Sequence, residues 1–409
     1  MKILKKIVIG IGILALLLCG LIVLCAINPD IEKKLASLVP QKEEAVEPAL
    51  SDPEIAIEEE ITARQAKEGV SENGIPEETT EEKPGASGET YEVIGPQDSA
   101  KNTPGNNNKG ANGYEIPSEL DVQVPTEVSG KGGYQPITEN TQQLGTGSGG
   151  ENNTNLGYGE TGDGLTFDTA FYPYYQMLDE KGKHLYRQIY ANANAVNAAF
   201  QPIESVEVSA IKDIIEAVYN DHPELFWLNT AFTCKYDSNN ICAEIDLEFN
   251  DTATDLSTSL ETFSNEASKI LWQVEHLPSN YDKEKAVHDL LMESIDYDKS
   301  ADINQSAYSA LVEKKTVCAG YARAMQYLLQ RLGIPCYYCT GYAGEDHAWN
   351  IVQLDDGYYN VDVTWDDTPG GEYDYFNRSD ADFKTTHVRK SLSVNLPVCD
   401  GQKYRDPGQ

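Results

Sequence analysis

A long stretch with few apolar side chains limits where this chain of 409 residues can build a hydrophobic core. Residues 28–164 alternate acidic patches, such as EEAVEPALSDPEIAIEEE, with Gly/Asn/Ser tracts, such as NTPGNNNKGANG. Sequence of this kind buries too little apolar surface to offset the conformational entropy that ordering removes. We therefore predict that residues 28–164 form a disordered, extended linker and that residues 165–409 form a globular domain. The alternative, that part of the stretch packs as a small domain, stays open.

The N-terminus predicts a membrane anchor. Residues 1–27 read MKILKK followed by the apolar run Ile7–Ile27, and about 20 apolar residues are needed to cross the hydrocarbon of a bilayer. The lysine-rich flank is expected on the cytoplasmic side. We predict an uncleaved, single-pass anchor in the cell membrane, with the C-terminal domain extracellular. A cleaved signal peptide and a lipid-modified Cys19 or Cys25 are the alternatives, but the residues around both cysteines match those signals poorly.

The charge of the chain excludes one class of partner. The sequence has 66 acidic and 31 basic residues, a formal net charge of −35. Nucleic acid binding requires cationic surface opposite the phosphates. We therefore predict no nucleic acid partner.

Residues 165–409 carry the periodic patterns of secondary structure. Helices are predicted at 173–198, 208–220, 255–276, 282–294 and 318–332, and strands at 231–236, 241–249, 336–342, 347–353 and 358–365. Helices grouped before a run of antiparallel strands favour the α+β class, with N-terminal helices and an antiparallel sheet.

Cys318 begins the predicted helix 318–332 and has two interpretations. It opens the apolar stripe that continues through Ala322 and Met325, so it fits a small buried core residue. Its place in the first turn favours a thiolate, because the free N–H groups and the helix dipole stabilise negative charge there. The small neighbours Ala319 and Gly320 leave room for a substrate.

The stretch DHAWNIVQLDDGYYNVDVTWDD supplies the partners that a cysteine nucleophile needs: a base, and a group that orients the base. His347 opens one predicted strand, and Asp362 lies in the next. The two residues face each other across the hairpin if the connection is the four-residue loop 353–356, or if a bulge corrects a tight turn at Asp356-Gly357. A core histidine and a capping aspartate are the alternatives.

These residues resemble a known family. VCAGYARAM, GIPCYYCTGYAGEDHAWNIV and GYYNVDVTWDD are similar to the core of the transglutaminase-like superfamily, a papain-like Cys-His-Asp fold found in many bacterial surface proteins. The resemblance covers residues 281–367 and implies that Cys318 is the nucleophile, His347 the general base and acid, and Asp362 the residue that orients the imidazole. Asp366 and Asp367 are near alternatives for Asp362.

The resemblance implies an extracellular, membrane-anchored thiol enzyme that acts on amide or peptide bonds through a thioester acyl-enzyme. Such an enzyme is expected to act on protein or cell-wall peptide, either as a peptidase or deamidase or as a protein cross-linking enzyme. The alternative is a non-catalytic surface module that binds or scaffolds. The backbone N–H of Cys318 is the expected first oxyanion donor, and Tyr297 and Tyr308 are candidates for the second. No cofactor or metal is expected, and the oligomeric state stays open.

Four of the five other cysteines in the predicted domain fall into two pairs. Cys336 and Cys339 form a C-x-x-C on a predicted strand, where residues three apart face opposite sides, and no second pair completes a zinc site. Cys234 and Cys242 flank the predicted hairpin turn and are candidates for a disulfide in an oxidising exterior.

Overall fold

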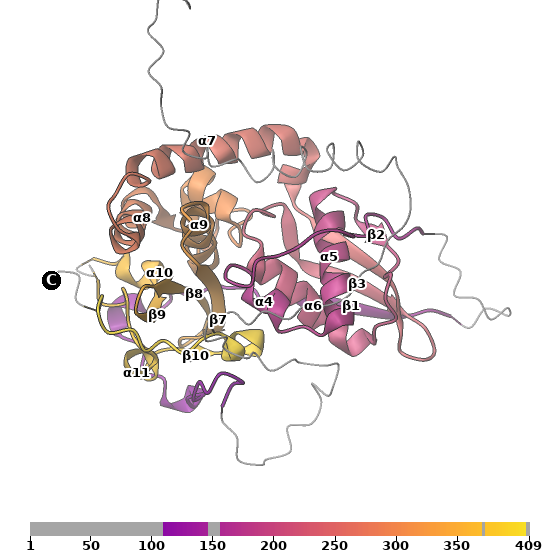
Figure 1. Ribbon diagram of the computed structural model, residues 1–409, viewed down its shortest axis with the longest axis horizontal. Coiled ribbons are helices and arrows are strands. Elements are labelled where there is room, and N and C mark those ends of the chain that lie inside the picture. The colour runs from indigo at the N-terminus through magenta and orange to yellow at the C-terminus, as the bar shows by residue number, and fades with distance from the viewer. Residues whose placement is uncertain (1–108, 146–155, 370–372, 406–409) are drawn as a thin grey trace, which may run out of the picture. The chain divides into compact units, whose positions relative to one another are not determined.

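The computed structural model describes residues 109–145, 156–369 and 373–405 (Figure 1). The predicted anchor, residues 1–27, and the predicted linker up to residue 108 lie outside these ranges. Within the described part of the chain, no helix combines the length and apolar character needed to cross a membrane. All described residues belong to one compact unit, residues 86–409.

Two four-stranded sheets organise this unit (Figure 1). The first has the order β1-β3-β4-β2, with β1 parallel to β3 and the other pairs antiparallel. The second has the order β10-β7-β8-β9 and is antiparallel throughout. The strands span Thr138–Gln143 (β1), Ala199–Phe200 (β2), Leu228–Tyr236 (β3), Cys242–Phe249 (β4), Cys336–Tyr342 (β7), Asp346–Leu354 (β8), Gly357–Val361 (β9) and Val388–Arg389 (β10). A short parallel pair joins β5, Asp296–Tyr297, to β6, Lys315–Thr316.

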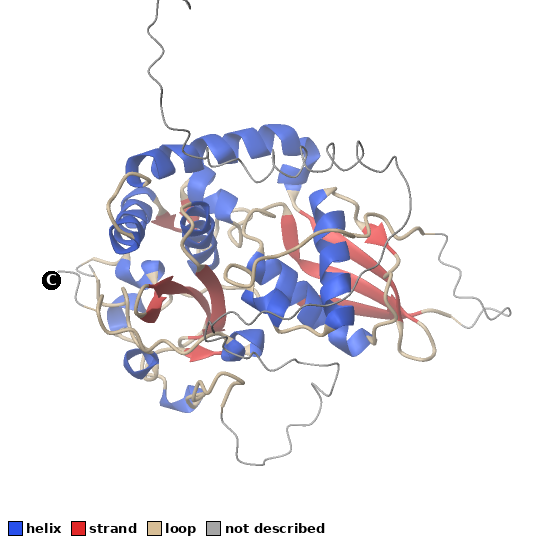
Figure 2. Cartoon of the chain, in the orientation of Figure 1, coloured by secondary structure: helices blue, strands red, loops and turns tan. Residues whose placement is uncertain are grey.

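Helices surround both sheets, and α7 runs along one side of the molecule (Figure 2). The α-helices span Pro173–Gln176 (α4), Glu180–Asn194 (α5), Val208–Asp221 (α6), Leu256–Val274 (α7), Asn280–Ser294 (α8), Cys318–Arg331 (α9), Val363–Asp366 (α10) and Asp380–Phe383 (α11). Helix α9 packs on β7 and β8 of the second sheet, and Asn350 of β8 donates to the carbonyl of Ala322 in α9 at 2.9 Å. This packing fixes the start of α9 against the start of β8.

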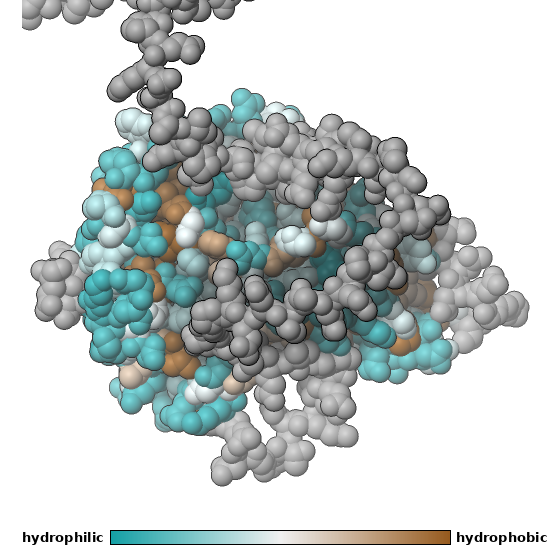
Figure 3. Space-filling view, in the orientation of Figure 1, coloured by the Kyte–Doolittle hydropathy of each residue, from teal (hydrophilic) through white to brown (hydrophobic). Residues whose placement is uncertain are grey.

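One buried cluster connects the two sheets. It contains Phe232 and Ile245 from the first sheet, Ile351 and Tyr359 from the second, and apolar residues from α5 to α9. Few large apolar side chains are exposed among the described residues, and Figure 3 shows a visible surface that is mostly hydrophilic with scattered hydrophobic residues. Most buried apolar residues after residue 165 therefore belong to one core, which supports the predicted α+β globular domain.

Most predicted elements are confirmed within a few residues. The predicted helix 318–332 is α9, the strand 336–342 is β7, and the hairpin arms 231–236 and 241–249 are β3 and β4. The single helix predicted at 173–198 is wrong, because α4 and α5 are separate. The chain breaks at Asp179, whose side chain accepts from the N–H of Gly182 and so caps the start of α5.

The prediction of a disordered linker up to residue 164 is wrong for residues 109–145 and 156–164. Residues 138–143 form β1 and pair with β3, and Tyr114, Val128, Tyr134 and Ile137 are buried. This stretch is too polar to form a core of its own, but it docks onto one that residues 165–409 supply. The folded unit therefore begins before residue 165.

Candidate active site

Cys318 is the first residue of α9, and the chain before it is held firmly. Val317 has extended backbone, and no side chain caps the helix start. The hydroxyl of Thr316 donates to the carbonyl of Asn304 at 2.8 Å and contacts Ser309. No side chain therefore caps the first turn of α9, and Cys318 is the first residue of this helix, as the sequence predicted.

Gly320 serves packing rather than substrate access. A Cβ at this position would meet the side chain of Thr316 and the carbonyl of Ser306. Gly320 thus lets the first turn of α9 lie against the chain that leads into it. For this residue, packing replaces the expectation that it leaves room for a substrate.

His347 lies near the start of β8, where it pairs with Gly341 of β7. Its Nε2 is 2.7 Å from Oδ2 of Asp362. Nδ1 is buried and has no hydrogen bond of ordinary geometry among the described residues. The Cys318 thiol is nevertheless near enough that its interaction raises the pKa of the imidazole. The structure therefore brings the three predicted site residues together.

Asp362 reaches His347 in a different way from the prediction. The strand predicted at 358–365 is wrong in its second half, because β9 ends at Val361 and Asp362 is the N-cap of α10. Its Oδ1 accepts from the N–H of Thr364 at 3.1 Å and of Trp365 at 3.2 Å. Oδ2 is left for His347. The capping role and the orienting role, which the sequence presented as alternatives, belong to the two oxygens of one carboxylate.

Neither predicted connection between β8 and β9 is correct. Leu354 pairs with Gly357, so a two-residue turn of Asp355 and Asp356 joins the strands. Val361 pairs with Asn350, and an extended β9 would place Asp362 opposite Trp349 rather than His347. The chain instead leaves the sheet at Asp362, and the change of direction carries the carboxylate to His347.

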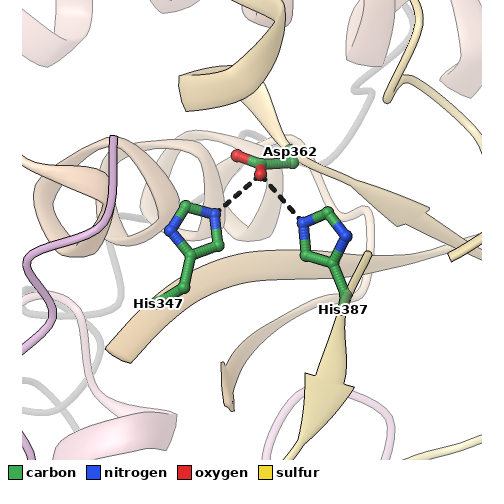
Figure 4. Close-up of side chains that lie close together, drawn as sticks. All are labelled: His347, Asp362 and His387. Carbon is green, nitrogen blue, oxygen red and sulfur yellow. Dashed lines mark hydrogen bonds and ion pairs between the residues drawn. The ribbon is translucent and has the colours of Figure 1, made fainter. Parts of the chain in front are cut away.

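His387 is a second histidine on the same carboxylate, which the sequence did not reveal (Figure 4). Its Nε2 is 3.2 Å from Oδ2 of Asp362, and its Nδ1 is 2.8 Å from the hydroxyl of Thr386. The ring is buried and stacks on Phe383, with 4.1 Å between the ring centroids. No local motif surrounds it. Only the pairing of β10 with β7 brings this part of the chain beside Asp362.

The two imidazoles differ in charge near neutral pH, because one is protonated and the other is neutral. Burial alone would lower the pKa of His347, but the Asp362 carboxylate and the Cys318 thiol raise it to about 10. Burial lowers the pKa of His387 to about 4 despite its hydrogen bond to Asp362. Burial opposes ionisation of Asp362, but His347 and then His387 hold the pKa of its carboxyl well below the usual range. His347 is therefore the charged partner, and neutral His387 donates its Nε2–H to the carboxylate.

The near alternatives from the sequence lie elsewhere. Asp366 bonds to His288 at 3.1 Å and accepts from the N–H of Tyr375. Asp367 accepts from the hydroxyl of Tyr321. Both carboxylates stabilise the region after Asp362 and do not bond to His347.

The two tyrosines that were candidates for the oxyanion site differ. Tyr308 packs against Phe226 and Phe263 in the core. Tyr297 lies close enough to Cys318 that, after burial itself, the thiol raises the pKa of its phenol. Tyr297 is thus the candidate that the fold places at the site.

Among the described residues, one group has donor atoms close enough together to hold a metal ion. It consists of His347, Asp362 and His387, whose donor atoms all lie within 4.8 Å of one another. Both Nε2 atoms already share Oδ2 of Asp362 through hydrogen bonds, and Oδ1 caps α10. The cluster is fully accounted for as a hydrogen-bonded network. A metal ion would have to displace both of the protons that hold it together.

The remaining cysteines of the domain are free thiols. Cys336 and Cys339 are buried within β7. Cys234 and Cys242 face each other across β3 and β4, with their sulfur atoms 2.8 Å apart and unbonded.

A cysteine at the start of a helix, beside a sheet histidine that an aspartate holds, is the arrangement of a papain-like Cys-His-Asp triad. Sequence comparison agrees with this geometry: residues 271–363 match the transglutaminase-like superfamily. The chain thus carries a domain of the transglutaminase-like superfamily.

Solved structures similar to this chain include a TGase, with 17% identity over 41% of this chain and 50% of that one, at a TM-score of 0.24. A candidate cysteine protease from Cytophaga hutchinsonii is 19% identical over 36% of this chain and 55% of that one, at a TM-score of 0.25. The chain thus spans about half the length of each. Among curated proteins, no sequence matches this chain significantly.

Proposed function

We propose that this protein is a thiol enzyme that acts on amide or peptide bonds through a thioester intermediate, with Cys318 as nucleophile. The observation that carries the proposal is the hydrogen bond of 2.7 Å between Nε2 of His347 and Oδ2 of Asp362. This bond leaves the other ring nitrogen, Nδ1, for the thiol. The buried carboxylate holds the ring in one orientation and favours its charged form. The Cys318 thiol near the ring distinguishes this pair from His288 and Asp366, which are also buried and bonded.

The chemistry follows from this arrangement. The Cys318 thiolate attacks the carbonyl carbon of the substrate, and the imidazolium of His347 gives its Nδ1 proton to the departing nitrogen as the C–N bond breaks. A thioester and a free amine or ammonia result. Water or an acceptor amine then attacks the thioester while His347 takes its proton, and the thiolate leaves. Asp362 keeps the ring oriented and stabilises its positive charge throughout.

The developing oxyanion needs donors on the side of the substrate carbonyl. The backbone N–H of Cys318 is the first, because α9 begins there with no capping side chain. The phenol of Tyr297, which lies near Cys318, is the second.

The reaction is tested by incubating the full chain with a peptide library that contains glutamine, with and without a small primary amine. We expect either amine incorporation, or release of ammonia or new peptide ends, and we expect neither from Cys318→Ala. Product formation that is equal in the wild type and in Cys318→Ala would overturn the proposal. A folded chain whose Cys318 reacts readily with iodoacetamide, but which forms no product with any peptide, would favour the non-catalytic module.

The cellular location is a separate proposal, supported by the apolar run Ile7–Ile27 and its lysine-rich flank. The run anchors the chain in the cell membrane, and the catalytic domain lies outside the cell. Protease added to intact cells should release the folded domain as a soluble fragment. Survival of the full-length chain until the membrane is opened would contradict this topology.

A further inference from the structure

Residues 130–135, with the sequence GKGGYQ, lie across the approach to Cys318. We call them the cover segment. The segment belongs to the stretch that the sequence predicted to be disordered, yet Tyr134 is buried in one cluster with Cys318, Val317 and Ala348. Cys318 and His347 have no exposed surface in the structure. The segment therefore stands where a substrate would have to bind.

The cover segment contacts the residues that precede His347 and Cys318 and, through Lys131, the chain just after α10. The N–H groups of Gly133 and Tyr134 donate to the carbonyl of Asp346, the residue before His347, at 3.0 and 3.3 Å. Lys131 donates to the carbonyl of Asp367, shortly after Asp362, at 3.1 Å. In Figure 4 a violet stretch of ribbon, in the colour that Figure 1 gives to the first described residues, passes beside His347.

Beside Cys318, the cover segment makes a packing contact. Gly133 lies against Val317, the residue before Cys318, so closely that a Cβ on Gly133 would be 3.3 Å from a methyl group of Val317. The segment thus meets the chain beside the nucleophile and beside the base.

Side chains hold the backbone of the cover segment through hydrogen bonds. The Tyr297 hydroxyl donates to the carbonyl of Gly132. The Gln305 amide donates to the carbonyl of Gly133 at 3.0 Å and accepts from the N–H of Gln135 at 2.8 Å. These bonds recognise main chain rather than side chains. The residue near Cys318 that is able to donate to a substrate carbonyl, Tyr297, already donates to a peptide carbonyl here.

Two successive positions of the segment accept only glycine. A Cβ on Gly132 would collide with the side chain of Glu345 and the carbonyl of Asp346. Gly133 has a φ of +107°, which side chains rarely adopt, in addition to its contact with Val317. The surface beside Cys318 is therefore shaped for a peptide with two consecutive glycines.

We propose that the cover segment occupies the acyl-donor site as a substrate-like inhibitor, and that this site takes peptides with glycine at two successive positions. The name "acyl-donor site" rests on the proposed function. Occupancy of the site by the cover segment does not rest on it, because this occupancy is measured by the reactivity of the Cys318 thiol and not by turnover. The cognate substrate class is a glycine-containing, unfolded peptide.

The test measures the rate at which iodoacetamide alkylates Cys318 in the full chain, quantified on the Cys318 peptide by mass spectrometry. In the double variant Gly132→Val/Gly133→Val the segment no longer fits. We expect alkylation about tenfold faster or more, since strain and collision of this kind shift a two-state equilibrium by at least that factor. A rate equal to that of the wild type would overturn the proposal.

Gly113→Val is the matched control. Gly113 also has a positive φ, of +84°, and lies in the same N-terminal stretch, but a Cβ there meets no atom within 4 Å. We expect Cys318 in this variant to react at the wild-type rate. An equal acceleration in the control would show that any strain in the stretch exposes the thiol, and would overturn the specific assignment.

Cys336 and Cys339 report unfolding in the same sample, because both are buried in β7. If they also react quickly in the double variant, Lys131→Ala replaces it. This change removes the bond to Asp367 and the contact with the Tyr297 ring without backbone strain. A smaller acceleration confined to Cys318 supports the proposal, and a wild-type rate contradicts it.

The substrate class is tested by adding a synthetic peptide of residues 129–137 to the double variant. The peptide should slow alkylation of Cys318, and the same peptide with valine at both glycine positions should not. Equal protection by both peptides, or by neither, would overturn the glycine preference. Alkylation of Cys318 reports peptide binding even if the protein catalyses no reaction. Failure of the glycine preference is therefore distinguishable from failure of the proposed reaction.

Discussion

Asp362 is the residue on which the site depends, because it serves three structural purposes with two oxygen atoms. Oδ1 caps α10, and Oδ2 receives one charged and one neutral imidazole. Such a fixed carboxylate does not rotate away when His347 gives up its proton. The geometry of His347 is therefore preorganised for both halves of the proposed reaction.

Replacing Asp362 by Asn should remove the orienting charge while keeping the shape. We expect kcat to fall by a factor on the order of 10² to 10⁴, less completely than in Cys318→Ala, because the imidazole survives without its charged partner. Asp366→Asn is the control, since Asp366 is a buried carboxylate of the same short helix that bonds to His288 instead. If both Asn variants lose activity equally, the loss reflects general damage to α10 and not the triad.

His387 should act as a positioning residue. His387→Gln removes one hydrogen bond to the Asp362 carboxylate, and we expect kcat to fall about tenfold with KM unchanged, as for loss of a single charge-assisted bond. Because burial lowers the pKa of His387 to about 4, its neutral form prevails above that pH, and the loss should be constant from pH 5 to 9. A lower melting temperature with normal kcat would show a purely structural role.

The grouping of Cys318, His347 and Asp362 could be predicted from the sequence, and the place of His387 beside Asp362 could not, for a physical reason. Cys318 begins an amphipathic helix and His347 lies near the start of a strand, so local patterns mark both residues. His387 precedes a strand of two residues, β10, whose position depends on pairing with β7. A contact that depends on distant pairing leaves no periodic signal in the sequence around it.

At the scale of elements, the sequence predicts α9, β7 and β8 well because each has a strong pattern of its own. It fails where one residue decides the path of the chain. Asp362 caps a helix where the pattern Val-Asp-Val suggests that a strand continues, and β1 is a polar, mostly exposed strand that pairing with β3 creates. Both errors come from tertiary contacts that override local propensity.

The hairpin of β3 and β4 should be sensitive to oxidation. Cys234 and Cys242 have sulfur atoms 2.8 Å apart, within reach of bond formation after a small side-chain movement. An oxidant such as a small-molecule disulfide should take two electrons and two protons from the pair and leave a cross-strand disulfide. The measurement is the intact mass before and after reduction, followed by peptide mapping. Oxidation that joins other cysteines, or none, would contradict the expectation.

At the scale of the whole molecule, composition predicts the folded region better than its boundary. The apolar residues after residue 165 form the core, as predicted, but the Gly-rich residues 109–145 add β1 and the cover segment to it. A segment that docks onto an existing core needs only a few anchors, such as Val128 and Ile137, and its average composition still resembles a linker.

The stability of the whole molecule should depend on pH through Glu284. Burial raises the pKa of this carboxyl in α8 to about 8, although Asn377 and His288 oppose the shift. The unfolded chain ionises near 4.3. The protonated group therefore stabilises the fold fully below about pH 4, and this contribution is lost as pH rises towards 8.

Glu284→Gln should remove that loss. We expect the variant to gain stability relative to the wild type between pH 5 and 8, on the order of 2–4 kcal/mol by pH 8, and no further gain above it. Thermal melts at several pH values measure the difference, and Glu293→Gln, an exposed residue of the same helix, is the control. A difference that does not change with pH would show that Glu284 is ionised in the fold.

The most direct test of the central claim is to trap the acyl-enzyme on Cys318. An activated acyl donor, such as a nitrophenyl ester of a glycine-containing peptide, is mixed with the wild type and with Gly132→Val/Gly133→Val, so that a covered thiol is not mistaken for an inert one. We predict one acyl group on Cys318, located by peptide mapping, released by hydroxylamine and absent from Cys318→Ala. Acylation at another residue, or undiminished turnover by Cys318→Ala, would contradict the assignment of Cys318 as the nucleophile.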